Sequence, residues 1–541
     1  MSRVDALAGE LTDRLFEADP LRPSVLGLPG DHDRLPRLGA AAEAGHRAAY
    51  LDIAARAEAV DVTGLDESLT RDVVIQQARA AVDLLDAKLP EFAVSDAFTA
   101  PMQLLLITLP MVPLTDQARV SGFLARLAAI PSFVDEVIER QSGSLVPPGF
   151  LVDAAIGYFD RLLATPGVAP LSLDVGSRAA ERDTLLENTV RPALARYREF
   201  LVAELKPRAR PAEEAGLCWQ PGGLQRYAGL IRAHTTTERS AQELHDIGLA
   251  LIADLAGEFR ALGRRVFGTG ELGEVFTRLR TDPALRWDSG EELLAAARTA
   301  IARAEAEAPR WFRTVPPQRC EVRAVPETDA DAGTIAYYIE PALDGSRPGT
   351  YYANTTHAGE RFRHVSEAVA YHEAVPGHHF QLSLALGLDL PLLRRIAEVN
   401  AYTEGWGLYA ERLADEMGLY TGDVARFGLL TQDAMRAARL VVDTGMHALG
   451  WSRQRAVDYL RENTPMAPVE IEEEIDRYAG CPGQALSYMA GRLEIERIRA
   501  GAERALGERF DLRDFHDVVL RHGILPLPVL DRVVSEWITS R

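Results

Sequence analysis

The sequence predicts a mainly α-helical fold with a small β-hairpin next to a histidine-rich helix. Helical periodicity with abundant alanine, leucine and acidic residues runs from about residue 40 to 205, and it resumes at Leu224. Only two short runs resemble strands, and both follow Pro309, where prolines become more frequent. The 541 residues suffice for several ordinary domains or for one large helical protein with two lobes.

The predicted elements fall into two parts separated by a linker. Residues 4–17 form the first expected helix. The clearest linker is 206–223, which contains Lys-Pro-Arg-Ala-Arg-Pro and Gln-Pro-Gly-Gly. We therefore expect an N-terminal helical lobe at 1–205 and a C-terminal helical lobe at 224–541. The second lobe carries the histidine-rich segment and a small sheet at about 334–355.

A glycine-rich segment, Gly268–Gly273, matches the Gly-x-Gly-x-x-Gly pattern of dinucleotide-binding loops. The residues before it, Ala261–Phe267, end a helical pattern rather than a β-strand, so the strand-turn-helix unit is missing. We interpret the segment as a loop between two helices. Ser240 and Glu243 are expected to form a capping box near the start of the helix that leads into it.

The charge and the cysteines narrow the choice of partners and compartment. A net charge of −20 argues against nucleic acid or an anionic membrane as the main partner. The three cysteines are widely spaced and indicate neither a disulfide framework nor a Cys-x-x-Cys zinc site. Residues 1–5 do not begin a signal-peptide core, and the most apolar stretch, Leu104–Leu109, is too short to span a bilayer. We expect a cytoplasmic protein, and a homodimer is compatible with the sequence.

The most informative segment is Tyr371–Gln381, which holds three of the twelve histidines and a glutamate. Its helix is expected to begin at Val365 or Ser366. Neutral imidazole is the commonest metal ligand in proteins, and a carboxylate beside a metal-bound water can act as its base. His372 followed directly by Glu373 therefore suggests a zinc hydrolase.

The spacing of the histidines requires a break in that helix. On an unbroken helix His379 would lie about 10 Å further along than His372, too far to share one ion, and His378 would point to another face. Pro376 removes a helical hydrogen bond, and Gly377 tolerates a distorted backbone. A bulged turn would bring His378, or alternatively His379, next to His372. The competing interpretation is two surface histidines at a helix break.

The third ligand is expected from a later helix. A tetrahedral zinc ion that keeps one position for water needs three protein ligands. Glu404 is the best candidate, because enough chain separates it from His378 for a loop and an antiparallel helix that returns to the metal. Glycines on both sides of Trp406 permit close helix packing. Glu404 would otherwise be a surface acid, and Glu411 is either a partner of the ligands or solvated.

Further residues are candidates for action on a substrate. Glu373 is the expected general base, which takes a proton from metal-activated water and passes it to the leaving amine. Tyr488 and Arg492 share one helix face. Tyr488 could donate to the oxyanion and Arg492 could bind a substrate carboxylate or assist, although a structural tyrosine–arginine pair is the alternative. Asp443 and His447 lie either beside the ligands or in the core.

A hairpin is predicted from two strand-like runs, Thr334–Ile339 and Gly349–Asn354. The turn-rich segment Asp344–Gly349 links the first run to the second. The hairpin directly precedes the histidine-rich segment. An extended edge strand beside a metal-binding helix could pair with a substrate backbone by β-augmentation. A purely structural hairpin explains the same pattern.

The candidate residues together predict a zinc-dependent hydrolase with one ion, with a peptidase acting on short peptides or a modified amide as the favoured activity. The nitrogen and oxygen ligand set also accepts manganese or cobalt. Two other functions stay open: reaction of a non-peptide biosynthetic intermediate at the same site, and peptide binding without catalysis at a vestigial site. The intact Glu373 argues against the last, because binding alone needs no base there.

Six segments that together cover most of the chain carry a family resemblance: Asp19–Leu21, His372–His379, Thr403–Trp406, Val442–Gly445, Pro482–Tyr488 and Gly523–Leu527. They resemble a large bacterial family known as domain of unknown function 885, whose members look like gluzincin-type metallopeptidases. The resemblance implies a mostly helical fold with two lobes around a deep cleft and a small sheet by the metal helix. The fold that the resemblance implies is similar in outline to that of the helical oligopeptidase and carboxypeptidase zincins. Function, however, depends on the site rather than on the fold.

Overall fold

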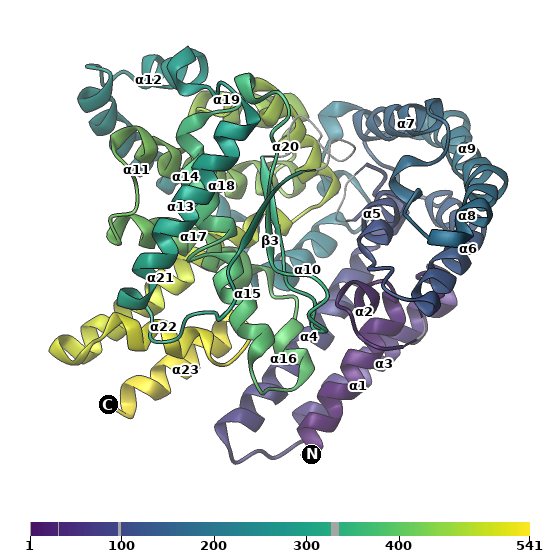
Figure 1. Cartoon of the computed structure of the whole chain (residues 1–541), viewed down its shortest axis with the longest axis horizontal. Helices are drawn as coiled ribbons and strands as arrows, with labels where there is room; N and C mark the ends of the chain where they lie inside the picture. The colour runs from purple at the N-terminus through teal and green to yellow at the C-terminus, as the bar shows by residue number, and fades with distance from the viewer. Residues whose placement is uncertain (1, 31, 96–98, 326–334) are drawn as a thin grey trace.

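The protein is mostly helical, as the computed structural model shows for residues 2–30, 32–95, 99–325 and 335–541 (Figure 1). The predicted mainly α class is therefore confirmed. One small three-stranded sheet accompanies the helices. In Figure 1, the blue helices α5 to α9 gather on one side of the molecule, whereas most of the green and yellow helices lie on the other.

The first part of the chain contains nine of the labelled α-helices, and the predicted helix at 4–17 is confirmed as α1. These helices are α1 Arg3–Ala18, α2 Arg22–Val25, α3 Ala40–Glu58, α4 Leu65–Ala87, α5 Pro101–Thr108, α6 Gln117–Gln141, α7 Gly149–Ala164, α8 Ala179–Leu185 and α9 Arg191–Phe200. Short 3-10 and π segments extend or connect several of them.

The second part of the chain contains the helices around the histidine-rich segment. They are α10 Gly223–Thr235, α11 Ala241–Val266, α12 Leu272–Thr281, α13 Gly290–Trp311, α14 Ser366–Glu373, α15 His378–Gly387, α16 Leu392–Ile396, α17 Asn400–Glu416, α18 Asp423–His447, α19 Arg453–Asn463, α20 Pro468–Gly480, α21 Ser487–Leu506, α22 Leu512–Leu520 and α23 Leu527–Thr539. The predicted Ser240–Glu243 capping box begins α11, and the glycine-rich segment after it joins α11 to α12 without a strand.

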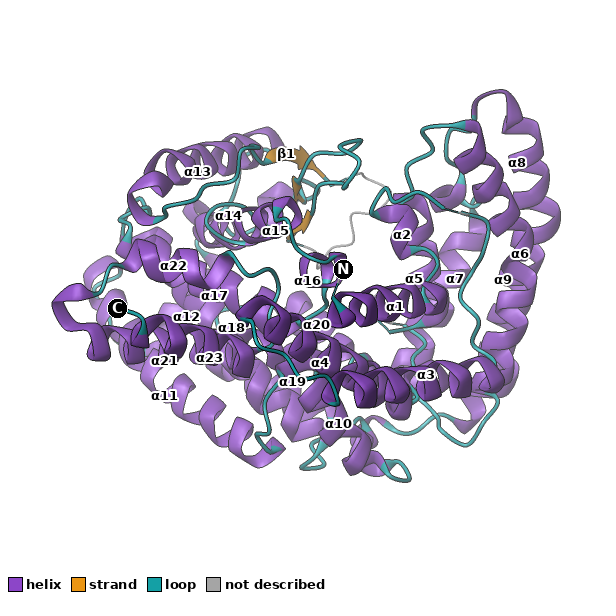
Figure 2. Ribbon diagram, turned by 90° about the horizontal axis from the view of Figure 1, so that it is seen from below, coloured by secondary structure: helices purple, strands orange, loops and turns teal. Residues whose placement is uncertain are grey.

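The sheet consists of β1 Glu321–Ala324, β2 Ala336–Ile339 and β3 Thr350–Ala353 in the order β1-β3-β2. Its strands are orange in Figure 2. Strands β2 and β3 are antiparallel, with Tyr337 opposite Tyr352, so the predicted hairpin is confirmed. Thr334, the first residue of the predicted run, lies outside the described residues. Strand β1 was not predicted and pairs with β3 in parallel. Edge strand β2 contacts α14, the first helix of the histidine-rich segment.

Three main hydrophobic clusters hold the helices together. One lies among α5 to α9, and a second joins α10 and α11 to α18, α19 and α20. The third joins α1, α3 and α4 to α13, α14, α17 and the C-terminal helices. The beginning of the chain therefore shares a core with its C-terminal half. Apolar burial at about 25 cal/mol per Å² is the main stabilising contribution in such cores.

The predicted linker at 206–223 is a packed segment of short 3-10 turns. Arg210 within it is buried, and its guanidinium donates to the carbonyl oxygens of Val146 and Gly216, each at 2.9 Å. The division into lobes at this segment stays a prediction. Across the described residues, no helix has both the length and the apolar character that a membrane crossing requires.

Candidate metal centre

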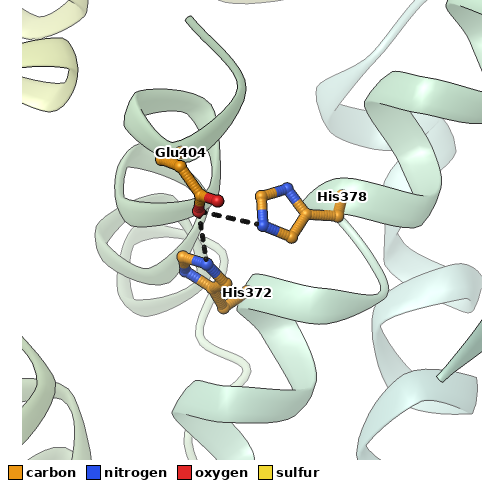
Figure 3. A group of neighbouring side chains, drawn as sticks. All are labelled: His372, His378 and Glu404. Carbon is orange, nitrogen blue, oxygen red and sulfur yellow. Dashed lines mark ion pairs between the residues drawn. The ribbon is translucent and has the colours of Figure 1, made fainter. Parts of the chain in front are cut away.

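The histidine-rich segment is broken between two helices. Helix α14 ends at Glu373, and α15 begins at His378. In the Pro376-Gly377 turn between them, the backbone of Gly377 lies very close to the end of α14. A methyl group on Gly377 would lie 1.8 Å from the carbonyl oxygen of His372. Only glycine fits such a close approach. His372 at the end of one helix and His378 at the start of the next therefore point toward one another (Figure 3).

Glu404 of α17 completes a group of three potential ligands (Figure 3). Its Oε2 lies 3.5 Å from Nε2 of His372 and 3.2 Å from Nε2 of His378. All three ligand atoms lie within 4.8 Å of one another. The structure thus brings together the three residues that the sequence predicted as ligands. Both histidines are buried, unlike surface histidines at a helix break.

His379 does not join the group, although it is adjacent to His378. Its Nε2 lies 2.9 Å from the carbonyl oxygen of Gln318, and its Nδ1 lies 3.0 Å from the hydroxyl of Tyr338 on β2. Both ring nitrogens thus have protein partners. Of the two alternatives left open by the sequence, the geometry favours His378 as the ligand.

Two glycines of α17 allow the close packing that places Glu404. A methyl group on Gly405 would lie 2.5 Å from the backbone of Gly491 on α21, so the two helices touch through their glycines. A methyl group on Gly407 would lie 2.6 Å from the imidazole of His372. The first glycine therefore brings α17 against α21, and the second leaves room for the ligand ring.

Glu411 fixes the orientation of His372. Its Oε1 lies 2.8 Å from Nδ1 of His372, and its side chain is 0% exposed. An Nδ1–H that donates to this carboxylate leaves the lone pair of Nε2 for a metal, the usual arrangement of a metal-binding histidine. Glu411 is accordingly a buried partner of a ligand rather than a solvated acid.

The charges around His372 favour a cation. Burial by itself lowers the pKa of His372, but contacts with Glu404 and Glu411 raise it to about 9. Burial also opposes ionisation of Glu404, yet the two histidines hold its pKa far below the usual range. A cluster in which carboxylates outnumber their cationic partners attracts a proton or a metal ion.

The three residues fit a zinc ion. Ligands at zinc-bond lengths of about 2.0–2.2 Å in a tetrahedron are about 3.4 Å apart, close to the two distances from Glu404 to the histidines. Oε2 of Glu404 is also buried without a hydrogen-bond partner among the described residues. Such an atom is costly unless something binds it. A nitrogen, nitrogen, oxygen set with a fourth position open is typical of catalytic zinc.

Glu373 and Tyr488 lie beside the cluster. Glu373 is half-buried, and burial raises the pKa of its carboxyl, although His372 and His378 lower it in part. Within the described chain its carboxylate makes no hydrogen bond or ion pair with another side chain, so it is free to bind water. The Tyr488 ring stacks near the ring of His372, with centroids 6.4 Å apart and planes 18° apart.

Arg492, the third predicted catalytic residue, has another partner. Its buried guanidinium binds the carboxylate of Asp433 on α18, and Glu496 lies 3.5 Å from its Nε. The structure therefore connects Arg492 to a buried ion pair rather than to the metal cluster. These contacts indicate a structural role for Arg492 in the ion pair with Asp433 rather than in a pair with Tyr488. Its predicted role in substrate binding stays a prediction.

Asp443 and His447 are buried but do not bind each other. Asp443 accepts from the hydroxyl of Tyr227 at 2.5 Å and from the backbone N–H of Gly483 at 3.1 Å. His447 lies 3.1 Å from the backbone nitrogen of Leu217. These contacts join α18 to α10 and to the turn before α21, so both residues belong to the core that supports the site.

Arg436 of α18 borders the cluster and was not predicted. Its Cζ lies 5.8 Å from the centre of the Tyr488 ring, and its charge acts on the carboxylate of Glu373. The signal was present in the sequence, because Arg436, Arg439 and Asp443 recur at helical spacing among the apolar residues of this helix. Polar residues on a fully buried helix are candidates for a site.

Comparisons with known proteins agree with this geometry only at the level of family and fold. Residues 20–534 match the family described as "Bacterial protein of unknown function (DUF885)". The chain belongs to the DUF885 family. No curated protein matches the chain. The family resemblance indicated by the sequence motifs is thereby confirmed, whereas its description assigns no activity.

Two solved structures share the fold of this DUF885 chain. The first, "putative lipoprotein from Colwellia psychrerythraea", is 30% identical, with a TM-score of 0.91, and the match covers 100% of this chain and 99% of that chain. The second, "a putative lipoprotein of unknown function from Shewanella oneidensis", is 16% identical, with a TM-score of 0.76 and coverage of 99% and 100%. The second likeness concerns the fold alone.

Proposed function

We propose that this DUF885 protein is a zinc-dependent hydrolase, and that it acts as a peptidase on an amide bond of short peptides. The observation that carries the proposal is the convergence of His372, His378 and Glu404 from three helices, with their ligand atoms within 4.8 Å of one another. Glu373, directly after the first ligand, supplies the base that a hydrolase needs. The proposal takes up the resemblance to gluzincin-type peptidases that the sequence motifs suggested.

In the proposed amide hydrolysis, some residues bind the metal and Glu373 transfers the proton. A zinc ion held by the three ligands would supply Lewis-acid activation of water and of the substrate carbonyl. Glu373 accepts the proton of the attacking water and delivers it to the leaving amine nitrogen. Its raised pKa, which burial causes, brings the carboxylate closer to that of a base working near neutral pH.

Tyr488 is the oxyanion donor in this proposal. Burial and the charge of Glu404 raise the pKa of its phenol, so the hydroxyl stays protonated near neutral pH. A protonated phenol can donate a hydrogen bond to the oxygen on which negative charge develops. Of the three candidate ligands, Glu404 has the most exposed side chain, at 21%, against 3% for His372 and 9% for His378. In this proposal the substrate therefore approaches the cluster from the side of Glu404.

A substrate panel tests the proposed function. The zinc-loaded protein is incubated with a library of peptides of two to ten residues and with a set of small non-peptide amides, and products are identified by mass spectrometry. We expect chelator-sensitive cleavage of short peptides. Cleavage of non-peptide amides alone would replace the peptidase by another hydrolase, and the absence of any zinc-dependent turnover would contradict both.

A further inference from the structure

Two arginines of α18 lie next to the candidate metal centre without a role in the steps described above. Arg436 and Arg439 are 8% and 5% exposed. They are three residues apart and therefore share one face of α18. Charged side chains are rarely buried to this degree unless they are paired.

The Tyr488 ring connects these arginines to the metal cluster. Cζ of Arg436 lies 5.8 Å from the centre of that ring, and Cζ of Arg439 lies 4.5 Å from it. The same ring stacks near the ring of His372 at 6.4 Å. A single aromatic side chain thus contacts both guanidinium groups and a candidate ligand.

Both guanidinium groups are incompletely paired. Nε of Arg436 and Nη1 of Arg439 are buried and have no hydrogen-bond partner in the described part of the chain. Nη1 of Arg436 donates to the side-chain oxygen of Gln432, which is neutral. No carboxylate of the described residues lies within ion-pair distance of Arg436. The carboxylate of Glu373 acts on Arg436 only from beyond ion-pair distance. A buried charge without a counter-charge in contact is unfavourable, so this position favours an anion from outside the chain.

The nearby carboxylate of Glu474 does not neutralise Arg436. Oε2 of Glu474 lies 2.8 Å from Nη2 of Arg439 and 3.1 Å from Nη2 of Arg477. One carboxylate is therefore shared by two guanidinium groups, and Arg436 adds a third positive charge beside them. This local excess contrasts with the net charge of −20 of the whole chain.

We propose that Arg436, with Arg439 beside it, binds a carboxylate of the substrate. The proposal rests on the hydrolase function above and names its substrate class: short peptides with a free carboxylate near the scissile amide. A guanidinium group can bind a carboxylate through two parallel N–H donors, and each of the two arginines has one buried nitrogen without a partner among the described residues. The carboxylate belongs to the chain end or to an acidic side chain, within a few residues of the scissile bond at about 3.4 Å per extended residue.

Binding to a variant that does not turn over tests the proposal. Calorimetry on the zinc-loaded Glu373→Gln protein compares acetyl-Ala-Ala-Ala with a free carboxylate, its C-terminal amide, and acetyl-Ala-Asp-Ala amide. We expect at least one carboxylate-bearing peptide to bind at least tenfold more tightly than the neutral amide. Preference for the first peptide assigns the chain-end carboxylate, and preference for the third assigns an acidic side chain.

The arginine is tested by a matched pair of variants in the same Glu373→Gln background. Arg436→Gln should abolish the preference, whereas Arg426→Gln should retain it. Arg426 lies on the same helix, forms surface ion pairs with Asp415 and Asp423, and loses the same charge on substitution. Arg436→Lys keeps the charge without the two parallel donors and should retain a reduced preference, which guards against misfolding of the glutamine variant.

Two results would overturn the inference. One is equal binding of all three peptides, or of none of them, by the zinc-loaded Glu373→Gln protein. The other is a preference for carboxylate that persists in Arg436→Gln. Cleavage of the neutral amide peptide by the protein with intact Glu373 would still support the hydrolase, so failure of the inference and failure of the proposed function give different results.

Discussion

His378 and His379 are adjacent in the chain but have different surroundings. His378 faces Glu404, and its Nδ1 is buried without a hydrogen-bond partner among the described residues. His379 binds the hydroxyl of Tyr338 and the carbonyl of Gln318. A ring with both nitrogens already bound to protein groups is a structural histidine, so residue type and position alone do not identify the ligand.

Because of this difference, replacement by asparagine should affect zinc affinity at His378 and thermal stability at His379. His378→Asn should reduce zinc affinity by at least a hundredfold, because it removes one of three ligands. His379→Asn should leave zinc affinity within a few-fold of the parent while it lowers thermal stability, because it removes buried hydrogen bonds. Competition with a chromogenic chelator measures both affinities. Equal loss of zinc in the two variants would contradict the assignment.

Glu373 is predicted to act in turnover and not in metal binding. Glu373→Gln should lower kcat by about 10²–10⁴-fold, the usual contribution of a general base. Zinc content should remain that of the parent, because Glu373 is not among the three ligands. Turnover and metal analysis on the same preparation check the two statements together. Unchanged turnover would favour a binding protein over an enzyme.

At the scale of elements, the site depends on how closely α17 approaches its neighbours. Gly407 faces the imidazole of His372, and a methyl group there would lie 2.6 Å from the ring. Alanine is ordinarily favoured over glycine in a helix by about 1 kcal/mol. The glycine therefore marks a position where packing against a ligand matters more than helix propensity.

Gly407→Ala should lower zinc affinity at least tenfold, because the added methyl displaces the imidazole of His372. Gly257→Ala on α11 is the matched control, because a methyl group there meets no atom within 4 Å. The control should retain zinc affinity and gain a little thermal stability. Chelator competition and thermal unfolding distinguish the two variants, and normal zinc affinity in Gly407→Ala would refute the packing argument.

The contacts of α18 predict a pH-dependent contribution from Asp443. Burial raises the pKa of its carboxyl to about 7, although bonds from Tyr227 and Gly483 lower it in part. The folded chain therefore binds this proton more tightly than the unfolded chain does. The resulting stabilisation is complete below the ordinary pKa of 3.8 and is lost as the pH rises through about 7.

The Asp443→Asn variant keeps a neutral hydrogen-bond acceptor at this position. Its stability should therefore not fall as the pH rises, as that of the parent does. Between pH 4 and pH 7, its free energy of unfolding relative to the parent should rise by about 1.4 kcal/mol per pH unit. Urea unfolding of the two proteins at several pH values measures the difference. A difference that stays constant over this range would show that Asp443 is ionised in the folded protein.

At the scale of the whole molecule, local sequence patterns predicted the mainly helical class, the first helix, the hairpin and the break at Pro376-Gly377. Strand β1 was missed because it has only four residues, two of which are charged, and because it forms by pairing with β3. The partner of Arg492 was missed for a similar reason, because Asp433 comes from another helix. Contacts between distant segments follow from packing, which a single sequence does not display.

The N-terminal helices share a hydrophobic core with the helices of the candidate metal centre, which the sequence patterns did not predict. Helices α1, α3 and α4 share a cluster with α14 and α17, which carry His372 and Glu404. The beginning of the chain therefore supports the helices of the candidate metal centre. A boundary inferred from proline and glycine content does not reveal such a shared core, because composition reports linkers and not contacts.

An anomalous-difference map from a zinc-loaded crystal, recorded above and below the zinc absorption edge, tests the central claim most directly. We predict one peak per chain, about 2.0–2.2 Å from Nε2 of His372, Nε2 of His378 and a carboxylate oxygen of Glu404. A map without a peak between these three atoms, from crystals shown to contain one zinc ion per chain, would contradict the account.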